Sequence, residues 1–339
     1  MDIETLEKNL NQGKVESIYL LYGEEIFLRE QILKKIKNIF GEMITGINYI
    51  NLGEENIKNL ISEAEIPAFG YSRKLIIARN TNIFKKEGKR KSDSQEKEII
   101  NKLSTYIKEN IENIKDNVII IFIEDEAEKN ALYDTISKNG IVCKFEEQKP
   151  VQIIKRLKQI CNLYKVNVNE SILQYFIECC GTNMQELINE IRKLIEYEGE
   201  NGTITKETVD LLATKKIESI IFELTDNLGK KNIAEALKVL NNLLYSKEPL
   251  QKILITLYNH FKKLYLVKLA NKYRKNVSDV LNLKANQTFL INKYNIQSKA
   301  FKEEELRNIM QQLIDLDYNY KIGKIDLNIG FEAILCTYV

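Results

Sequence analysis

The hydrophobic positions of residues 1–147 form short β-branched runs that alternate with helical patterns. This alternation is typical of a parallel sheet covered by helices, because parallel strands need a crossover between them. Between the second and third runs, Ile57, Leu60, Ile61 and Ala64 recur at helical spacing and predict one apolar helix face. The predicted strands are 18–22, 47–52, 74–78, 118–123 and 141–145.

From Val151 onward the hydrophobic period is helical to the end of the chain. Residues 148–214 predict a helical subdomain of about 65 residues, inside the usual domain range. Gly181 predicts a helix end, and Asn183 (in a capping box with Glu186) and Thr205 predict helix starts. Residues 215–339 predict a further all-helical unit. Its apolar stripes are wide enough to pack internally and still leave surface for neighbouring chains.

The stretch SIYLLYGEEIFLRE, residues 17–30, predicts a strand, a glycine turn and the start of a helix. This is where a nucleotide-binding protein carries G-x-x-x-x-G-K-[ST]. Counted from Gly23, the last three positions hold Leu28, Arg29 and Glu30, so the second glycine, the lysine and the metal-binding hydroxyl are all replaced. The pattern favours an NTPase-like architecture without its chemistry. The alternative is an ordinary strand-turn-helix of another α/β protein, since fold does not fix function.

The fourth predicted strand ends in IFIEDEAEKN, where an NTPase would place its metal-binding and water-activating acids. Glu124, Asp125, Glu126 and Glu128 supply the acidity. Carboxylates at such a position also cap the following helix. Without a phosphate-binding lysine and hydroxyl, we interpret these residues as capping groups rather than catalytic ones.

Composition narrows the class of protein. With 339 residues, 44% hydrophobic content and a formal net charge of +2, the chain predicts two or three globular domains without a global commitment to nucleic acid. It lacks a long apolar run and a signal-peptide pattern, so we expect a soluble, cytoplasmic protein. No cofactor or metal is expected, because His260 is the single histidine and the cysteines, interpreted as reduced core residues, lack C-x-x-C spacing. The cysteines are Cys143, Cys161, Cys179, Cys180 and Cys336.

Five motifs follow one another along the whole chain. They are YLLYGEE (19–25), IPAFG (66–70) before RKLIIA, CGTNMQELINEIRKL (180–194), IIFELTDNLGKKNIAEAL (220–237) and LIDLDYNYKIGKIDLNIGFEAIL (313–335). In this order and spacing the sequence resembles one family, the delta subunits of the bacterial DNA polymerase III clamp loader.

The resemblance implies a fold and a division of the chain. It implies an α/β N-terminal domain, a degenerate AAA+/RecA-like parallel sheet with flanking helices, over residues 1–147. An all-α lid subdomain would follow over residues 148–214, and an all-α collar domain for oligomerisation over residues 215–339.

The resemblance also implies a mechanical function in DNA replication. Such a subunit binds the sliding clamp (beta) and opens or holds open one ring interface for loading on primed DNA. The implied partners are the other clamp loader subunits (gamma/tau and delta prime) and primer-template DNA within the assembled loader, with no membrane. The chain would not be an enzyme or hydrolyse ATP, although it would count as a component of the DNA-directed DNA polymerase holoenzyme.

The family's clamp contact is an exposed hydrophobic pair in the loop before the third strand. Here that loop reads Ile66, Pro67, Ala68, Phe69, Gly70 and Tyr71. Phe69 matches the aromatic member of the pair, but Ala68 is smaller than its usual partner, which leaves Ile66, Pro67 or Tyr71 to supply the missing area. The alternative is a buried turn with Phe69 in the domain core, since apolar side chains usually face inward.

Two other functions stay open. An active AAA+ ATPase would need another lysine and hydroxyl in place of the missing pair. A stand-alone, sequence-independent DNA-binding scaffold would draw on the polar segment 85–98, otherwise interpreted as a mobile surface insertion, and on the lysines at 262–263 and 272–275.

Overall fold

The computed structural model describes residues 1–85, 94–245, 248–284 and 287–337. Contacts between residues divide the chain into two compact units, Met1–Glu147 and Gln148–Val339. Each unit is described by itself.

The first unit is built on a five-stranded, fully parallel sheet with the order β2-β3-β4-β1-β5. Of the three interior strands, β4 and β1 are buried along their whole length, as expected for a parallel sheet covered on both faces. The strands are β1 (Ile18–Tyr22), β2 (Tyr49–Leu52), β3 (Lys74–Arg79), β4 (Val118–Glu124) and β5 (Ile141–Lys144).

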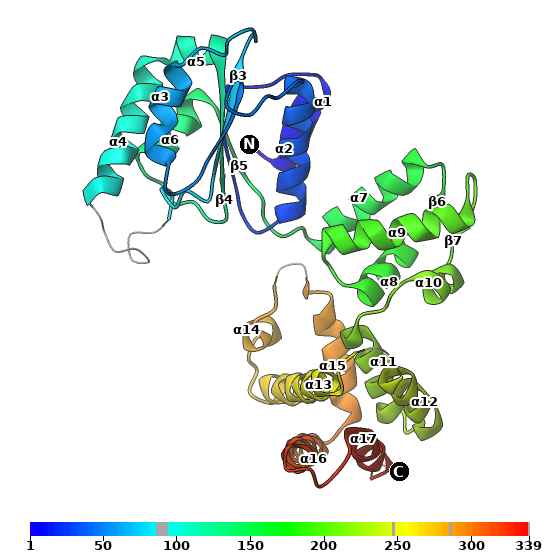
Figure 1. Ribbon diagram of the computed structural model, residues 1–339. Coiled ribbons are helices and arrows are strands. Elements are labelled where there is room, and N and C mark those ends of the chain that lie inside the picture. Colours follow the sequence, from blue (N-terminus) through cyan, green and yellow to red (C-terminus); the bar gives the residue numbers. More distant parts are fainter. Residues whose placement is uncertain (86–93, 246–247, 285–286, 338–339) are drawn as a thin grey trace. The chain divides into compact units, whose positions relative to one another are not determined.

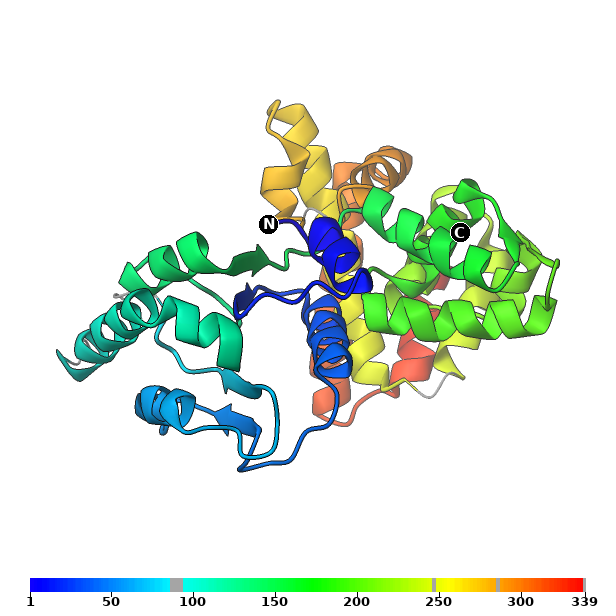
Figure 2. The same cartoon turned by 90° about the horizontal axis from the view of Figure 1, so that it is seen from above.

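Helices cover both faces of this sheet (Figures 1 and 2). Alternate strand residues explain the two layers: Leu20 and Ile120 pack with α3, α4, α5 and α6 on one face, whereas Leu21 and Ile121 pack with α1 and α2 on the other. The helical elements are α1 (Ile3–Asn11), α2 (Ile26–Phe40), the 3₁₀ turn η1 (Ile57–Asn59), α3 (Leu60–Glu65), α4 (Ser94–Glu109), α5 (Ile111–Asn117) and α6 (Ala131–Asn139).

The second unit is helical apart from one short strand pair. Its elements are α7 (Pro150–Leu163), β6 (Asn167–Val168), α8 (Glu170–Cys180), α9 (Met184–Glu198), β7 (Thr203–Ile204), α10 (Lys206–Leu212), α11 (Ile217–Gly229), α12 (Ile233–Leu244), α13 (Leu250–Lys272), α14 (Val277–Leu281), α15 (Leu290–Ala300), α16 (Glu303–Lys321) and α17 (Leu327–Cys336). The α11–α17 region shares one apolar core. The division of this unit into lid and collar stays a prediction.

The predicted fold class, an α/β N-terminal part followed by a helical remainder, is confirmed. The predicted helix signals are also confirmed: Asn183 and Thr205 cap α9 and α10, and Gly181 ends α8 at a φ of 83°. Glycine fits there because a positive φ costs it no steric strain.

Several details of the prediction were wrong. The second unit is not purely helical, since β6 pairs in parallel with β7. The polar segment 85–98 is helical from Ser94, and its residues 86–93 lie outside the described residues. Cys336 is exposed, whereas the other four cysteines are buried as free thiols.

His260 is a buried structural residue of α13, as the sequence predicted. Its Nε2 lies 2.9 Å from Gln297 Oε1, and burial lowers its pKa to about 3. The imidazole is therefore neutral at physiological pH.

None of the helices in the described ranges has the length and apolar content needed to span a bilayer.

Candidate functional site

The loop between α3 and β3, residues 66–71, is a tight turn that we call the wedge loop. The Tyr71 N–H donates to the Ala68 carbonyl at 2.8 Å, and Gly70 has a φ of 83°. A four-residue turn with a positive φ at its third position favours glycine there. The turn therefore carries Phe69 at its second position, and Gly70 at its third position lets the chain reverse direction.

The apolar side chains of the wedge loop point outward. Phe69 is 73% exposed and Ile66 is 47% exposed. Pro67 is also exposed, whereas Ala68 and Tyr71 are half-buried. The alternative interpretation, a buried turn with Phe69 in the core, is therefore wrong.

Two cations after the turn hold the wedge loop against the sheet. The Arg73 guanidinium donates to the carbonyls of Lys115 and Asp116, beside the start of β4. Lys74 is buried and donates to the Glu63 carbonyl in α3 at 2.8 Å; burial lowers its pKa. The sequence analysis missed both roles, although an Arg-Lys pair directly before an apolar strand was a visible signal.

A second loop with apolar residues lies at the same edge of the sheet as the wedge loop, the amino edge, where the strands begin. Residues 41–48 lead into β2, the neighbour of β3, and carry the partly exposed Met43, Ile44 and Ile47. Asn48 fixes this loop by accepting from the Ile44 N–H and donating to the Glu42 carbonyl. The amino edge of the sheet thus presents exposed apolar side chains from two ordered loops.

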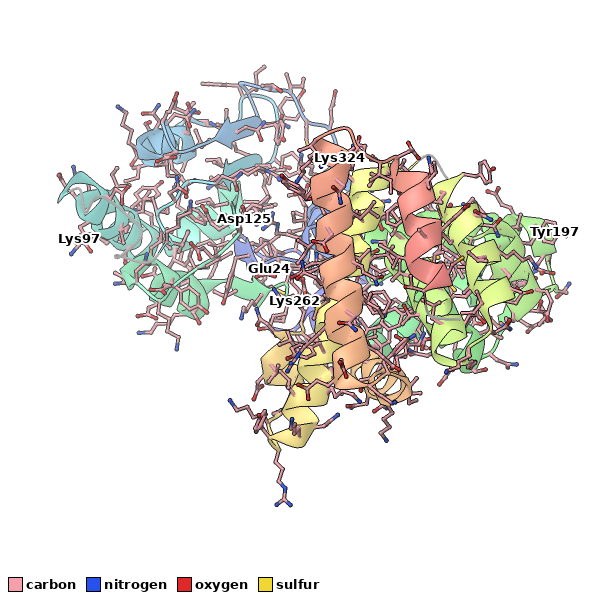
Figure 3. All side chains as sticks on the ribbon, turned by 90° about the horizontal axis from the view of Figure 1, so that it is seen from below. Glu24, Lys97, Asp125, Tyr197, Lys262 and Lys324 are labelled. Atoms are coloured by element: carbon pink, nitrogen blue, oxygen red, sulfur yellow. The ribbon has the colours of Figure 1, made fainter. Side chains whose placement is uncertain are left out.

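The predicted nucleotide position lies at the opposite, carboxyl edge of the sheet, where Glu24 and Asp125 are labelled in Figure 3. The Gly23 N–H donates to the Glu124 carbonyl and the Glu25 N–H to the Phe145 carbonyl. Gly23 has a φ of 126°, and a Cβ there would lie 2.3 Å from the Phe145 carbonyl oxygen. These two amides, which a phosphate loop would direct at a ligand, are bonded to neighbouring strand ends.

The three replaced motif residues each have a partner within the protein. Leu28 is buried in the core between the sheet and α2. Arg29 is only 3% exposed; it donates to the carbonyls of Gly23 (3.1 Å) and Glu124 and forms an ion pair with Asp125 at 3.1 Å. Glu30 accepts two bonds from Arg79, at 2.7 and 3.1 Å, and this contact lowers the Glu30 pKa.

The acids after β4 do not cap the next helix, so that interpretation was wrong. Asn130 caps α6 by accepting from the Tyr133 N–H. Glu124 is buried and accepts from the Thr81 N–H and hydroxyl after β3, and burial raises its pKa. In the described ranges, no group of three or more His, Cys, Asp or Glu side chains is arranged to hold a metal ion.

Comparisons with known proteins identify the same family in both units. The family model "DNA polymerase III, delta subunit" matches residues 19–146, and "DNA polymerase III delta subunit, C-terminal domain" matches residues 218–338. The DNA polymerase III subunit delta of Bacillus subtilis is 24% identical over 97% of this chain and 94% of its own length. A probable DNA polymerase III subunit delta of Aquifex aeolicus is 28% identical over 89% of this chain and 85% of its own length. The solved structure of the Bacillus subtilis DNA clamp loader delta protein has the same fold, with a TM-score of 0.74, 21% identity and 99% coverage of both chains.

Proposed function

Because the chain belongs to the family of DNA polymerase III delta subunits, which are clamp loader subunits in DNA replication, we propose that it binds the sliding clamp and holds one ring interface open. The observation that carries this proposal is the exposed ring of Phe69 on the wedge loop. A single exposed apolar residue is common on protein surfaces, whereas a group of them marks an interaction site. Phe69 shares its loop with the exposed Ile66, and the neighbouring loop 41–48 at the same end of the sheet exposes further apolar side chains.

The wedge loop is suited to this contact because little ordering remains for binding to impose. The turn hydrogen bond and the contacts of Arg73 and Lys74 fix its backbone. A preorganised loop loses less conformational entropy on association than a flexible one. Ile66 is the other exposed large side chain of the loop, which makes it the first candidate, ahead of Pro67 and Tyr71, to replace the area that Ala68 lacks.

Ring opening then follows from differential affinity. A ligand shifts a two-state equilibrium only by as much as it prefers one state. We propose that the clamp pocket fits Phe69 better when the neighbouring ring interface is distorted. A pull-down with sliding clamp, and with the other loader subunits in a separate lane, tests the partner assignment; failure of the chain to retain clamp contradicts it.

We predict that the chain does not bind ATP tightly or hydrolyse it. The Arg29 guanidinium, bonded to Gly23 and Glu124, and the Glu30–Arg79 pair fill the position that the lysine and hydroxyl would occupy. Isothermal titration of the purified subunit with ATP and Mg²⁺ is expected to show no stoichiometric binding. Saturable binding that depends on Mg²⁺ would restore the ATPase alternative.

We further propose that residues from about 215 onward join the chain to the other loader subunits and that the first unit carries clamp binding. Ile314, Tyr318 and Ile322 lie four residues apart and leave one face of α16 exposed and apolar. A cut near Thr214 would damage the second unit, because Lys216 donates to the Cys179 carbonyl and pairs with Glu186. The better boundary is Glu147, since both apolar clusters of the first unit are complete before it.

The fragment Met1–Glu147 is therefore predicted to retain clamp binding and to be absent from the reconstituted loader. Co-elution of the fragment and of the full chain, each with clamp or with the other subunits, measures this. Entry of the fragment into the loader would place the assembly surface in the first unit instead.

A further inference from the structure

The wedge loop by itself is too small to form a stable interface with the clamp. A specific protein–protein interface buries about 800 Å² on each partner, and one phenylalanine side chain supplies about 150–250 Å² of that area. The exposed large apolar side chains of the wedge loop are Phe69 and Ile66. A large part of the interface must therefore come from surface that lies next to this loop.

The two flanks of the wedge loop differ in chemistry. On the β4 side, where Arg73 contacts the end of α5, the exposed residues 115–117 are polar or charged. On the β2 side lie residues 41–48, which we call the β2 loop. Its apolar side chains Met43, Ile44 and Ile47 are 37–40% exposed. The apolar surface at the amino edge of the sheet therefore continues toward β2 and not toward β4.

Hydrogen bonds hold the β2 loop in one conformation. The Ile44 carbonyl accepts from the N–H groups of Ile47 and Asn48, at 3.1 and 3.2 Å. The Asn48 side chain is buried, accepts from the Ile44 N–H at 2.7 Å and donates to the Glu42 carbonyl at 2.9 Å. A loop that is already ordered loses little conformational entropy when a partner covers it. The β2 loop is therefore prepared for binding in the same way as the wedge loop.

The two loops are joined through their strands. The Leu75 N–H in β3 donates to the carbonyl of Asn48, directly before β2, at 2.8 Å. Neighbouring strands lie about 4.8 Å apart, so the two loops enter adjacent strands at a fixed separation. We propose that the β2 loop is a second contact for the sliding clamp, where it covers an apolar patch beside the site that receives Phe69. This inference rests on the proposed function, because it takes the clamp as the partner of the wedge loop.

The first test is surface plasmon resonance of the full chain on immobilised clamp. The variant Met43→Gln/Ile47→Thr replaces two apolar side chains with polar ones of similar size. It is expected to bind clamp about fivefold more weakly, a smaller loss than for Phe69→Ala, because residues around an anchor contribute less than the anchor itself. The matched control is Ile26→Thr/Leu163→Gln. Ile26 is 57% exposed at the opposite edge of the sheet and Leu163 is 81% exposed in the second unit, so the control should bind like the native chain.

The second test is photocrosslinking, which detects the contact itself and does not depend on the stability of the double variant. The photoreactive variant Met43→p-benzoylphenylalanine is mixed with clamp and irradiated. A covalent product with the clamp is expected, whereas Leu163→p-benzoylphenylalanine should give none. The inference is overturned if the two double variants bind clamp equally well, or if crosslinking is no stronger from position 43 than from position 163.

The same experiments distinguish failure of this inference from failure of the proposed function. A native chain that does not retain clamp contradicts the proposed function, and the second contact falls with it. A native chain that binds clamp and loses affinity in Phe69→Ala, but not in Met43→Gln/Ile47→Thr, keeps the proposed function and excludes only the β2 loop.

Discussion

Replacing Phe69 with alanine is expected to weaken binding to the sliding clamp by at least about tenfold. Burying a phenylalanine side chain is worth about 1.5–3 kcal/mol, and a tenfold change corresponds to about 1.4 kcal/mol. As an interface anchor, its truncation can cost about 2 kcal/mol or more. Surface plasmon resonance on immobilised clamp measures the loss directly.

The stability of the Phe69→Ala variant should be nearly unchanged, because the ring is 73% exposed in the chain alone. Tyr197→Ala is the matched control: Tyr197 is 61% exposed on α9, in the other unit, and is labelled in Figure 3. It should bind clamp normally. If the Phe69→Ala and Tyr197→Ala variants bind clamp equally well, the clamp contact lies outside the wedge loop. Ile66→Ala and Tyr71→Ala in the same assay identify which residue supplies the second apolar contact.

Much of the fold follows from local patterns. Strand positions in a buried parallel sheet are continuous apolar runs, so 18–22 and 118–123 were placed to within a residue of β1 and β4. The start of β2 was set too early, because Ile47 belongs to the preceding loop, which Asn48 fixes through its side chain. An apolar residue directly before a strand gives the same local sequence pattern whether it belongs to the strand or to the loop before it.

Long-range contacts account for what the sequence did not reveal. The β6–β7 pair joins two-residue segments separated by α8 and α9, and no hydrophobic period reports so short a pairing. The role of Glu124 depends on Thr81, which follows a different strand. Local capping rules therefore assigned the acids after β4 to the wrong partner.

The candidate site shows the same division. The sequence predicted a loop at residues 66–71 before the third strand, and its role in clamp binding stays a prediction. The outward orientation of the loop depends on Arg73 reaching residues near the start of β4 and on Lys74 reaching α3. Composition alone favoured burial of Phe69. Only the tertiary contacts decide between an apolar residue in the core and the same residue at the tip of a turn.

Arg29→Met is expected to lower the free energy of unfolding of the first unit by about 2–4 kcal/mol. The Gly23 and Glu124 carbonyls each accept from this buried guanidinium, and hydrogen bonds to charged groups contribute about 1.5–3 kcal/mol. The Glu124 carbonyl keeps the Gly23 N–H as a partner, which limits its share. The Asp125 side chain is 71% exposed, so that ion pair adds little. Urea denaturation followed by circular dichroism measures the change.

Two further variants separate the guanidinium contacts from a general effect on α2. Arg29 Nη1 donates to both carbonyls, and Nη2 donates to Asp125. Arg29→Lys keeps the charge, but its single ammonium cannot reproduce all three contacts of the planar guanidinium, so an intermediate loss is expected. Lys34→Met, on the exposed face of the same helix, should change stability by less than about 0.5 kcal/mol. A loss no larger for Arg29→Met than for Lys34→Met would show that the guanidinium does not hold the strand ends together. Once folded, Arg29→Met should still bind clamp, because the wedge loop lies at the other edge of the sheet.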